Sequence, residues 1–148
     1  MSLFISYSKN FPISVSLEEK LNTALSYIFN EEGIIDGSIN LKILTDEDMK
    51  ELNKRFRNKN TATNVLSFSN EDISKSITGN LGDIAISYEF VKRESKELKK
   101  NFDDHMIHML IHGVYHILGF DHENDEMADI MEMKEVELLK KLHIKNPY

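Results

Sequence analysis

Residues 112–122 read HGVYHILGFDH, a segment that holds three histidines with a glycine between the last two. His112 and His116 are four positions apart, so on a helix both rings project from one face. Gly119 follows where such a helix should end, because glycine readily takes the left-handed backbone conformation of a helix C-terminus. The segment therefore predicts a helix over about 103–118, then a turn that brings His122 back to the other two rings.

Three imidazoles in this arrangement indicate a metal site. The chain has no cysteine, which excludes thiolate ligands, and structural zinc sites are usually closed by cysteines. Three protein nitrogens that leave one position open are typical of a catalytic site instead. The alternative is a histidine-rich amphipathic helix, because His105 and His108 fall near the same helix face. We predict that His112, His116 and His122 bind one metal ion per chain.

The same histidine spacing occurs in the metzincin proteases, whose motif is HExxHxxGxxH. The match holds at the three histidines and at Gly119, but Gly113 stands in place of the glutamate. That glutamate is the general base of peptide hydrolysis, and glycine cannot abstract a proton. A metallopeptidase is therefore the weaker interpretation and would need a base from elsewhere, for instance Glu123 or Glu126.

Length and composition favour one domain. A chain of 148 residues is large enough for a substantial core without disulfides. The lack of cysteine fits a reducing compartment, and the first residues have neither the basic region nor the long apolar run of a secretory signal. No stretch approaches the roughly 20 apolar residues that cross a bilayer. We predict a single domain over residues 1–148, located in the cytoplasm, with no membrane partner.

The net charge of −7 argues against broad, non-specific binding of nucleic acid. The distribution is uneven, since residues 50–59 contain five basic residues and one acid, whereas residues 123–137 contain seven acids and one lysine. At physiological salt, charges are screened beyond about 8 Å, so a local basic groove can still hold a phosphate chain. The alternative is that these segments are solvated helix faces.

Hydrophobic periodicity predicts an α+β fold, a single domain with a small mixed sheet of about four strands packed with about five helices. A capping box at Ser16 and Glu19 opens the first helix, which ends near Gly33. Thr45 is predicted to cap the second helix. Strands are expected at residues 3–6, 38–44, 65–68 and 82–87, helices at 46–56, 88–100, 103–118 and 126–142, and a loop or hairpin connection at 70–80.

Three segments together resemble the YbeY family of bacterial rRNA maturation factors and endoribonucleases. HGVYHILGFDH is similar to that family's H-G-x-L-H-L-x-G-Y-D-H signature, NKRFRNKNTATNVLSF to its N-x-x-F/Y-R…T-D-V-L-S-F segment, and LGDIAIS to its L-G-D-I-x-I-S strand. The segments lie in the family's order over residues 53–122. One departure is Asn64, which stands in place of an aspartate. The other is Tyr115 in place of a leucine and Phe120 in place of a tyrosine, changes that preserve size and an apolar body.

The resemblance implies a zinc-dependent endoribonuclease that cleaves single-stranded RNA in rRNA maturation, including 16S rRNA 3′ end processing, and in ribosome quality control. It implies Zn²⁺ ligation by the three histidines, one ion per chain, and makes Arg57 the functional arginine. The implied partners are rRNA, the small ribosomal subunit or ribosome-associated factors, and not DNA. Asp83 and Asp121 also match the family pattern. We interpret them as a strand-entry residue and a carboxylate that holds a ligand histidine.

Two points stay open at the level of sequence. The attacking group is either a water activated by the zinc ion or the 2′-hydroxyl of the RNA. Arg57 would bind non-bridging phosphate oxygens with its planar fork, or else it is a solvated loop arginine. Besides the metallopeptidase, a further alternative is a non-catalytic ribosome-assembly factor whose zinc is structural.

Overall fold

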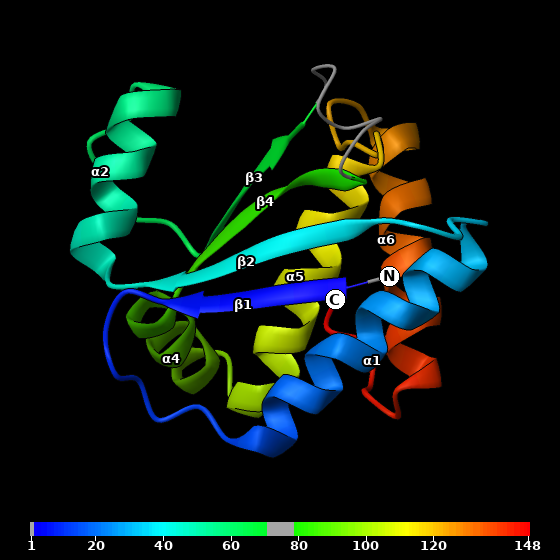
Figure 1. The fold of residues 1–148 in the computed structure, drawn as a ribbon, viewed down its shortest axis with the longest axis horizontal. Coiled ribbons are helices and arrows are strands. Elements are labelled where there is room, and N and C mark those ends of the chain that lie inside the picture. Colours follow the sequence, from blue (N-terminus) through cyan, green and yellow to red (C-terminus); the bar gives the residue numbers. More distant parts are fainter. Residues whose placement is uncertain (1, 71–78) are drawn as a thin grey trace.

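The computed structural model describes residues 2–70 and 79–148. Within them, four strands form one sheet in the order β1-β2-β4-β3. The first three in that order, β1 (Ser2–Tyr7), β2 (Ser38–Leu44) and β4 (Asn80–Ser87), run parallel. The last, β3 (Val65–Ser69), is antiparallel to β4 and forms one edge (Figure 1). The sheet is therefore mixed, as predicted.

Five helices accompany the sheet in the described ranges, which confirms a single α+β domain. They are α1 (Val15–Glu31), α2 (Asp46–Arg57), α4 (Tyr88–Glu97), α5 (Phe102–Ile117) and α6 (Asp125–Lys141). Among these described helices, none has the length and apolar character that crossing a membrane requires.

The predicted helix boundaries are correct to within a few residues, with one wrong cap. The first helix begins at Val15, because the Ser14 hydroxyl accepts a hydrogen bond from the Leu17 amide at 3.0 Å. Ser16 lies inside the first turn and is not the cap. Thr45 does cap α2, as predicted, through the Asp48 amide at 3.1 Å. The connection predicted at 70–80 falls largely on residues 71–78, which lie outside the described residues.

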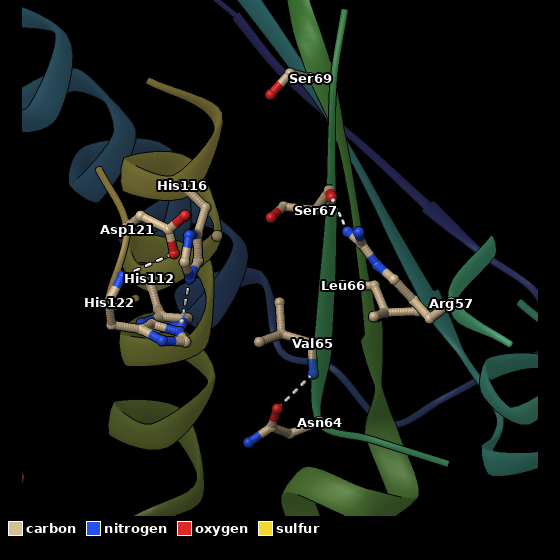
Figure 2. A pocket seen from close by; sticks show the side chains of 11 residues that line it. Arg57, Asn64, Val65, Leu66, Ser67, Ser69, His112, His116, Asp121 and His122 are labelled. Carbon is tan, nitrogen blue, oxygen red and sulfur yellow. Dashed lines mark hydrogen bonds between the residues drawn. The ribbon is translucent and has the colours of Figure 1, made fainter. Parts of the chain in front are cut away.

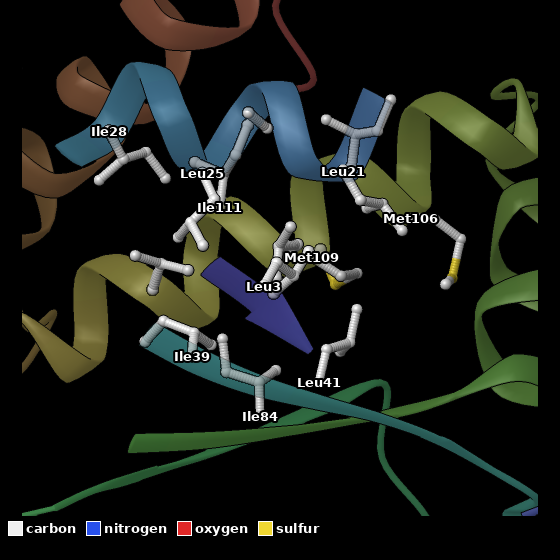
Figure 3. Close-up of a cluster of buried hydrophobic side chains, with 14 of the residues drawn as sticks. Leu3, Leu21, Leu25, Ile28, Ile39, Leu41, Ile84, Met106, Met109 and Ile111 are labelled. Atoms are coloured by element: carbon white, nitrogen blue, oxygen red, sulfur yellow. The ribbon is translucent and has the colours of Figure 1, made fainter. Parts of the chain in front are cut away.

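The sheet separates a large core from a small one. Along β4, Ile84 and Ile86 pack into the large core, whereas Ala85 belongs to the small cluster on the other side. This alternation follows from the period of two along a strand. Helices α1 and α5 cover the large-core side (Figure 3), and Met49 of α2 packs beside Ala85.

Helix α5 is the central helix of the domain and lies close against the sheet. A Cβ atom added at Gly113 would stand 3.1–3.4 Å from three side-chain carbons of Ile84 on β4. A larger side chain at position 113 would therefore push helix and strand apart. The glycine that replaces the protease glutamate thus has a packing role, and it sets the distance between the helix that carries two histidines and the sheet.

Candidate metal centre and active cleft

Helix α5 ends just before Gly119, as the sequence predicts. Gly119 has φ of +102°, in the left-handed region. Its amide donates to the His116 carbonyl at 3.1 Å, and the Phe120 amide donates to the Tyr115 carbonyl at 3.0 Å. This pair of bonds is the Schellman motif, which satisfies the last helical carbonyls and turns the chain. The turn directs residues 120–122 back along the helix toward its histidines.

The turn brings the three predicted histidines together. The Nε2 atoms of His112 and His116 are 3.1 Å apart, and one ring nitrogen from each of the three histidines lies within 4.8 Å of the others. A tetrahedral ion with metal–nitrogen bonds of about 2.0–2.1 Å requires nitrogen separations of about 3.3 Å. The triad is therefore arranged to hold one metal ion after small side-chain movements, and His122 is the most exposed of the three.

Hydrogen bonds at the outer ring nitrogens orient two of these histidines. The Nδ1 atom of His116 contacts the Phe120 carbonyl at 3.1 Å, and the Nδ1 atom of His112 contacts both carboxylate oxygens of Glu135 at 3.3 Å. Because each partner is an acceptor, each Nδ1 carries the proton. The lone pair is then on Nε2, which is the atom that faces the other histidines.

The protonation of His116 also suits a ligand. Burial is the main cause that lowers its pKa below the usual value, and the neighbouring charges of His112 and His122 lower it further. The ring is consequently neutral near pH 7, and a metal ion binds a neutral imidazole.

Glu135 is a residue of this site that the sequence analysis missed. It lies on α6 with no solvent exposure. Burial would raise the pKa of its carboxyl, but hydrogen bonds from His108 and His112 outweigh this and hold the pKa well below its usual range. The signal was present in the sequence, because Glu135 interrupts the apolar stripe formed by Met131 and Leu138. An acid in such a stripe needs a partner inside the core.

The histidines form one wall of an open cleft of about 530 Å³. Strand β3 forms the opposite wall (Figure 2). The described residues that line the cleft are Arg57, Asn64, Val65, Leu66, Ser67, Ser69, His112, Gly113, His116, Asp121 and His122. Asp121 is the only acid among them, so neither Glu123 nor Glu126 lines the cleft.

Arg57 lines the cleft but does not meet the histidines. Its guanidinium lies on the other side of β3 from them in Figure 2 and donates to the Ser67 carbonyl at 3.1 Å. It also lies 5.6 Å from the centre of the Phe68 ring. A guanidinium has five N–H donors, so the bond to Ser67 leaves others for a ligand in the cleft.

Three further residues of the sequence analysis have defined places. Asp121 accepts a hydrogen bond from the His122 amide at 2.7 Å, so it shapes the turn, and the carboxylate that contacts a ligand ring is that of Glu135. Asp83 lies within β4 and accepts from the Asn40 side chain at 2.9 Å, so it is not a strand-entry residue. The Asn64 amide donates to Glu94 at 3.1 Å, a contact in which an aspartate would place two carboxylates together.

Comparison with known proteins gives a consistent assignment. The family model described as endoribonuclease YbeY matches residues 5–143. The endoribonuclease YbeY of Francisella philomiragia is 38% identical over 135 residues, which cover 88% of this chain and 85% of the relative. That of Francisella tularensis is also 38% identical, over 138 residues, which cover 88% of this chain and 80% of the relative.

The fold agrees with an experimental structure as well. A protein of Thermotoga maritima solved in solution has a TM-score of 0.63 and 26% identity, over 96% of this chain and 92% of that one. The family match extends over both walls of the cleft and the histidine turn. The chain therefore belongs to the endoribonuclease YbeY family.

Proposed function

We propose that this protein is a zinc-dependent endoribonuclease that cleaves single-stranded RNA in rRNA maturation, including the 3′ end of 16S rRNA, and in ribosome quality control. The observation that carries the proposal is the convergence of three histidine nitrogens within 4.8 Å on a cleft that Arg57 also lines. The function requires access to rRNA or the small ribosomal subunit, and hence a cytoplasmic location.

The donor set supports zinc. Three neutral imidazoles with no thiolate suit Zn²⁺ and leave a position for water or substrate. When bound in such a site, Zn²⁺ acts as a Lewis acid on a phosphate oxygen or lowers the pKa of water. His112, His116 and His122 would hold it, and Arg57 would bind non-bridging phosphate oxygens as their charge develops.

A basic path next to the cleft supports an RNA substrate. Arg57 and Leu66 line both the cleft and a neighbouring hollow, to which Lys59 also belongs. The last turn of α2 adds Lys54 and Arg55. These cations would contact the backbone and position the strand, because phosphate contacts set register without reading sequence. The net charge of −7 then limits binding elsewhere on the surface.

The cleft favours a nuclease over a peptidase. Gly113 occupies the position of the peptidase base, and the acid in the cleft, Asp121, is bonded to the His122 amide. A peptidase base from Glu123 or Glu126 finds no support, since neither residue lines the cleft. The remaining alternative is an assembly factor with a structural zinc ion.

The test is RNA cleavage by matched preparations of the zinc-loaded, chelated and His116→Ala proteins. We expect cleavage of a short single-stranded RNA by the zinc-loaded protein alone, with no cleavage of single-stranded DNA or of an unfolded protein. Cyclic 2′,3′-phosphate ends would identify the 2′-hydroxyl as the attacking group. Ends with a 5′-phosphate and a 3′-hydroxyl would identify water, because attack by the 2′-hydroxyl always leaves a 5′-hydroxyl. A zinc-loaded protein that cleaves no RNA but unfolds on chelation would show that the zinc is structural.

A further inference from the structure

The ligand His112 is held by a carboxylate that comes from a different helix. Glu135 of α6 and His112 of α5 are 23 positions apart in the chain, and the Nδ1 atom of His112 lies 3.3 Å from each oxygen of Glu135. The Glu135 side chain is only 1% exposed. The carboxylate therefore lies inside the core, where few water molecules compete for it, whereas the His112 side chain is 21% exposed.

Two other side chains contact the same carboxylate, and both do so at one oxygen. The Nε2 atom of His108 lies 2.8 Å from Oε1 of Glu135, and the Tyr148 hydroxyl donates to Oε1 at 3.1 Å. These two contacts fix the rotation of the carboxyl group. The second oxygen, Oε2, lies 3.3 Å from the Nδ1 atom of His112.

The three groups around Glu135 come from two other parts of the fold. His108 precedes His112 by one turn of α5, and Tyr148 belongs to the segment after α6. That segment is held in place by Lys100, whose ammonium group donates to the Pro147 carbonyl at 3.1 Å. Glu135 is thus the point at which α5, α6 and the following segment are joined beside the metal site.

We propose that Glu135 is a positioning residue for the metal centre, and that His108 and Tyr148 keep its carboxylate turned toward His112. By accepting the Nδ1 proton, Glu135 sets the tautomer in which Nε2 of His112 is free to bind the ion. An imidazole whose outer nitrogen bonds to a carboxylate is also a stronger ligand. The inference rests on the proposed function only in assigning a metal ion to the three histidines.

A purely structural role would give a different result. Buried ion pairs also join helices, and breaking one lowers stability whether or not a metal is present. A positioning role instead changes the affinity of the folded protein for the ion. The two roles are separated by measuring metal affinity and metal-free stability on the same variant.

The experiment uses Glu135→Gln, which keeps the side-chain shape but has one amide oxygen in place of two carboxylate oxygens. Competition with a chromogenic chelator measures the affinity for Zn²⁺, and the absorption spectrum of the Co²⁺-loaded protein reports ligand geometry. We expect affinity to fall about 10- to 100-fold with a changed Co²⁺ spectrum. Tyr148→Phe removes the hydroxyl that contacts Glu135 and His108 and should lower affinity about 2- to 10-fold. It serves as the second variant if Glu135→Gln does not fold.

The matched control is Glu94→Gln. Glu94 of α4 contacts His105 of α5, the helix that also carries His112, at 2.7 Å, and it contacts none of the three histidines of the metal site. It should lower melting temperature and leave Zn²⁺ affinity unchanged. Wild-type affinity in folded Glu135→Gln, or an equal loss in Glu94→Gln, overturns the positioning role alone. Failure of the wild-type protein to bind Zn²⁺ at all would overturn the proposed function together with it.

Discussion

Helix α5 carries two pairs of histidines in opposite chemical situations. In the first pair, His105 and His108 are buried, and the Nε2 atom of each contacts a carboxylate at 2.7 and 2.8 Å. In the second pair, the Nε2 atoms of His112 and His116 face each other at 3.1 Å beside an open cleft. One helix therefore presents the same ring nitrogen to acids in its first half and, in its second half, to a histidine triad that could hold a metal ion.

The difference shows that the group opposite a histidine decides its chemistry. In the first pair, Glu94 of α4 contacts the Nε2 atom of His105, and Glu135 of α6 contacts the Nε2 atom of His108. The turn at Gly119 brings a third histidine, and not an acid, to the second pair. Glu135 contacts both pairs, since it accepts from His108 and also from the outer nitrogen of His112. A variant that changes the metal site without changing the first pair, or the reverse, tests whether the two pairs are independent.

The largest effect is expected from His122→Ala. This residue lies outside α5, so its removal leaves the helix intact and takes away one ligand of the metal site. We expect Zn²⁺ affinity to fall by more than the roughly 100-fold typical of changes beside a ligand, with loss of RNA cleavage. Metal content and cleavage are measured together. The control is His143→Ala, because His143 is an exposed histidine outside the three-histidine site. Unchanged affinity in His122→Ala would rule out that site.

Arg57→Ala should separate catalysis from metal binding. Loss of a transition-state contact costs about 3–4 kcal/mol, or about 10²–10³ in rate, while zinc content and melting temperature stay near those of the wild type. Arg57→Lys should restore only part of the lost cleavage rate, since an ammonium group lacks the two-pronged geometry of a guanidinium. Single-turnover cleavage of a short RNA is the measurement. Arg55→Ala removes the same charge outside the cleft, and an equal loss there would reduce the role of Arg57 to general attraction of RNA.

His105→Ala should affect stability without affecting the metal. The change leaves a cavity and removes the Nε2 contact of Glu94, which together should cost about 1–3 kcal/mol of unfolding free energy. The loss should be the same in the metal-free and the zinc-loaded protein, as measured by denaturant unfolding. A fall in Zn²⁺ affinity would show that the first pair is not independent of the site.

The smallest effect is a pH dependence of the metal-free fold. Burial lowers the pKa of His105 from 6.5, outweighing the opposite effect of Glu94, while His108 and Lys100 add to the lowering. The unfolded chain then binds a proton that the folded chain does not, so stability should decrease as pH falls below 6.5 and toward the lower folded-state pKa. The decrease should be shallower in His105→Ala, and equal slopes in the two proteins would contradict this origin.

Local patterns in the sequence predict most of the elements and the convergence of the three histidines. Thr45 caps α2, the strands alternate as expected, and the interval from His112 through Gly119 to His122 specifies a helix, its end and a returning turn. These features depend on residues within a few positions of one another. The wrong prediction of a cap at Ser16 also concerns neighbouring residues, since Ser14 has an equivalent hydroxyl two positions earlier and is the actual cap.

Contacts between residues far apart in the chain could be identified only from the tertiary structure. Sequence indicates that His105, His108, His112 and His116 share a helix face, but it does not tell which of them meets an acid. Glu135 reaches His108 and His112 only because α6 packs on α5, and Arg57 reaches the cleft only because β3 pairs beside β4. The sequence by itself determined the histidine triad that could hold a metal ion, because one helix and one turn build it. The packing of distant elements decided which ring nitrogens are left free for a metal ion.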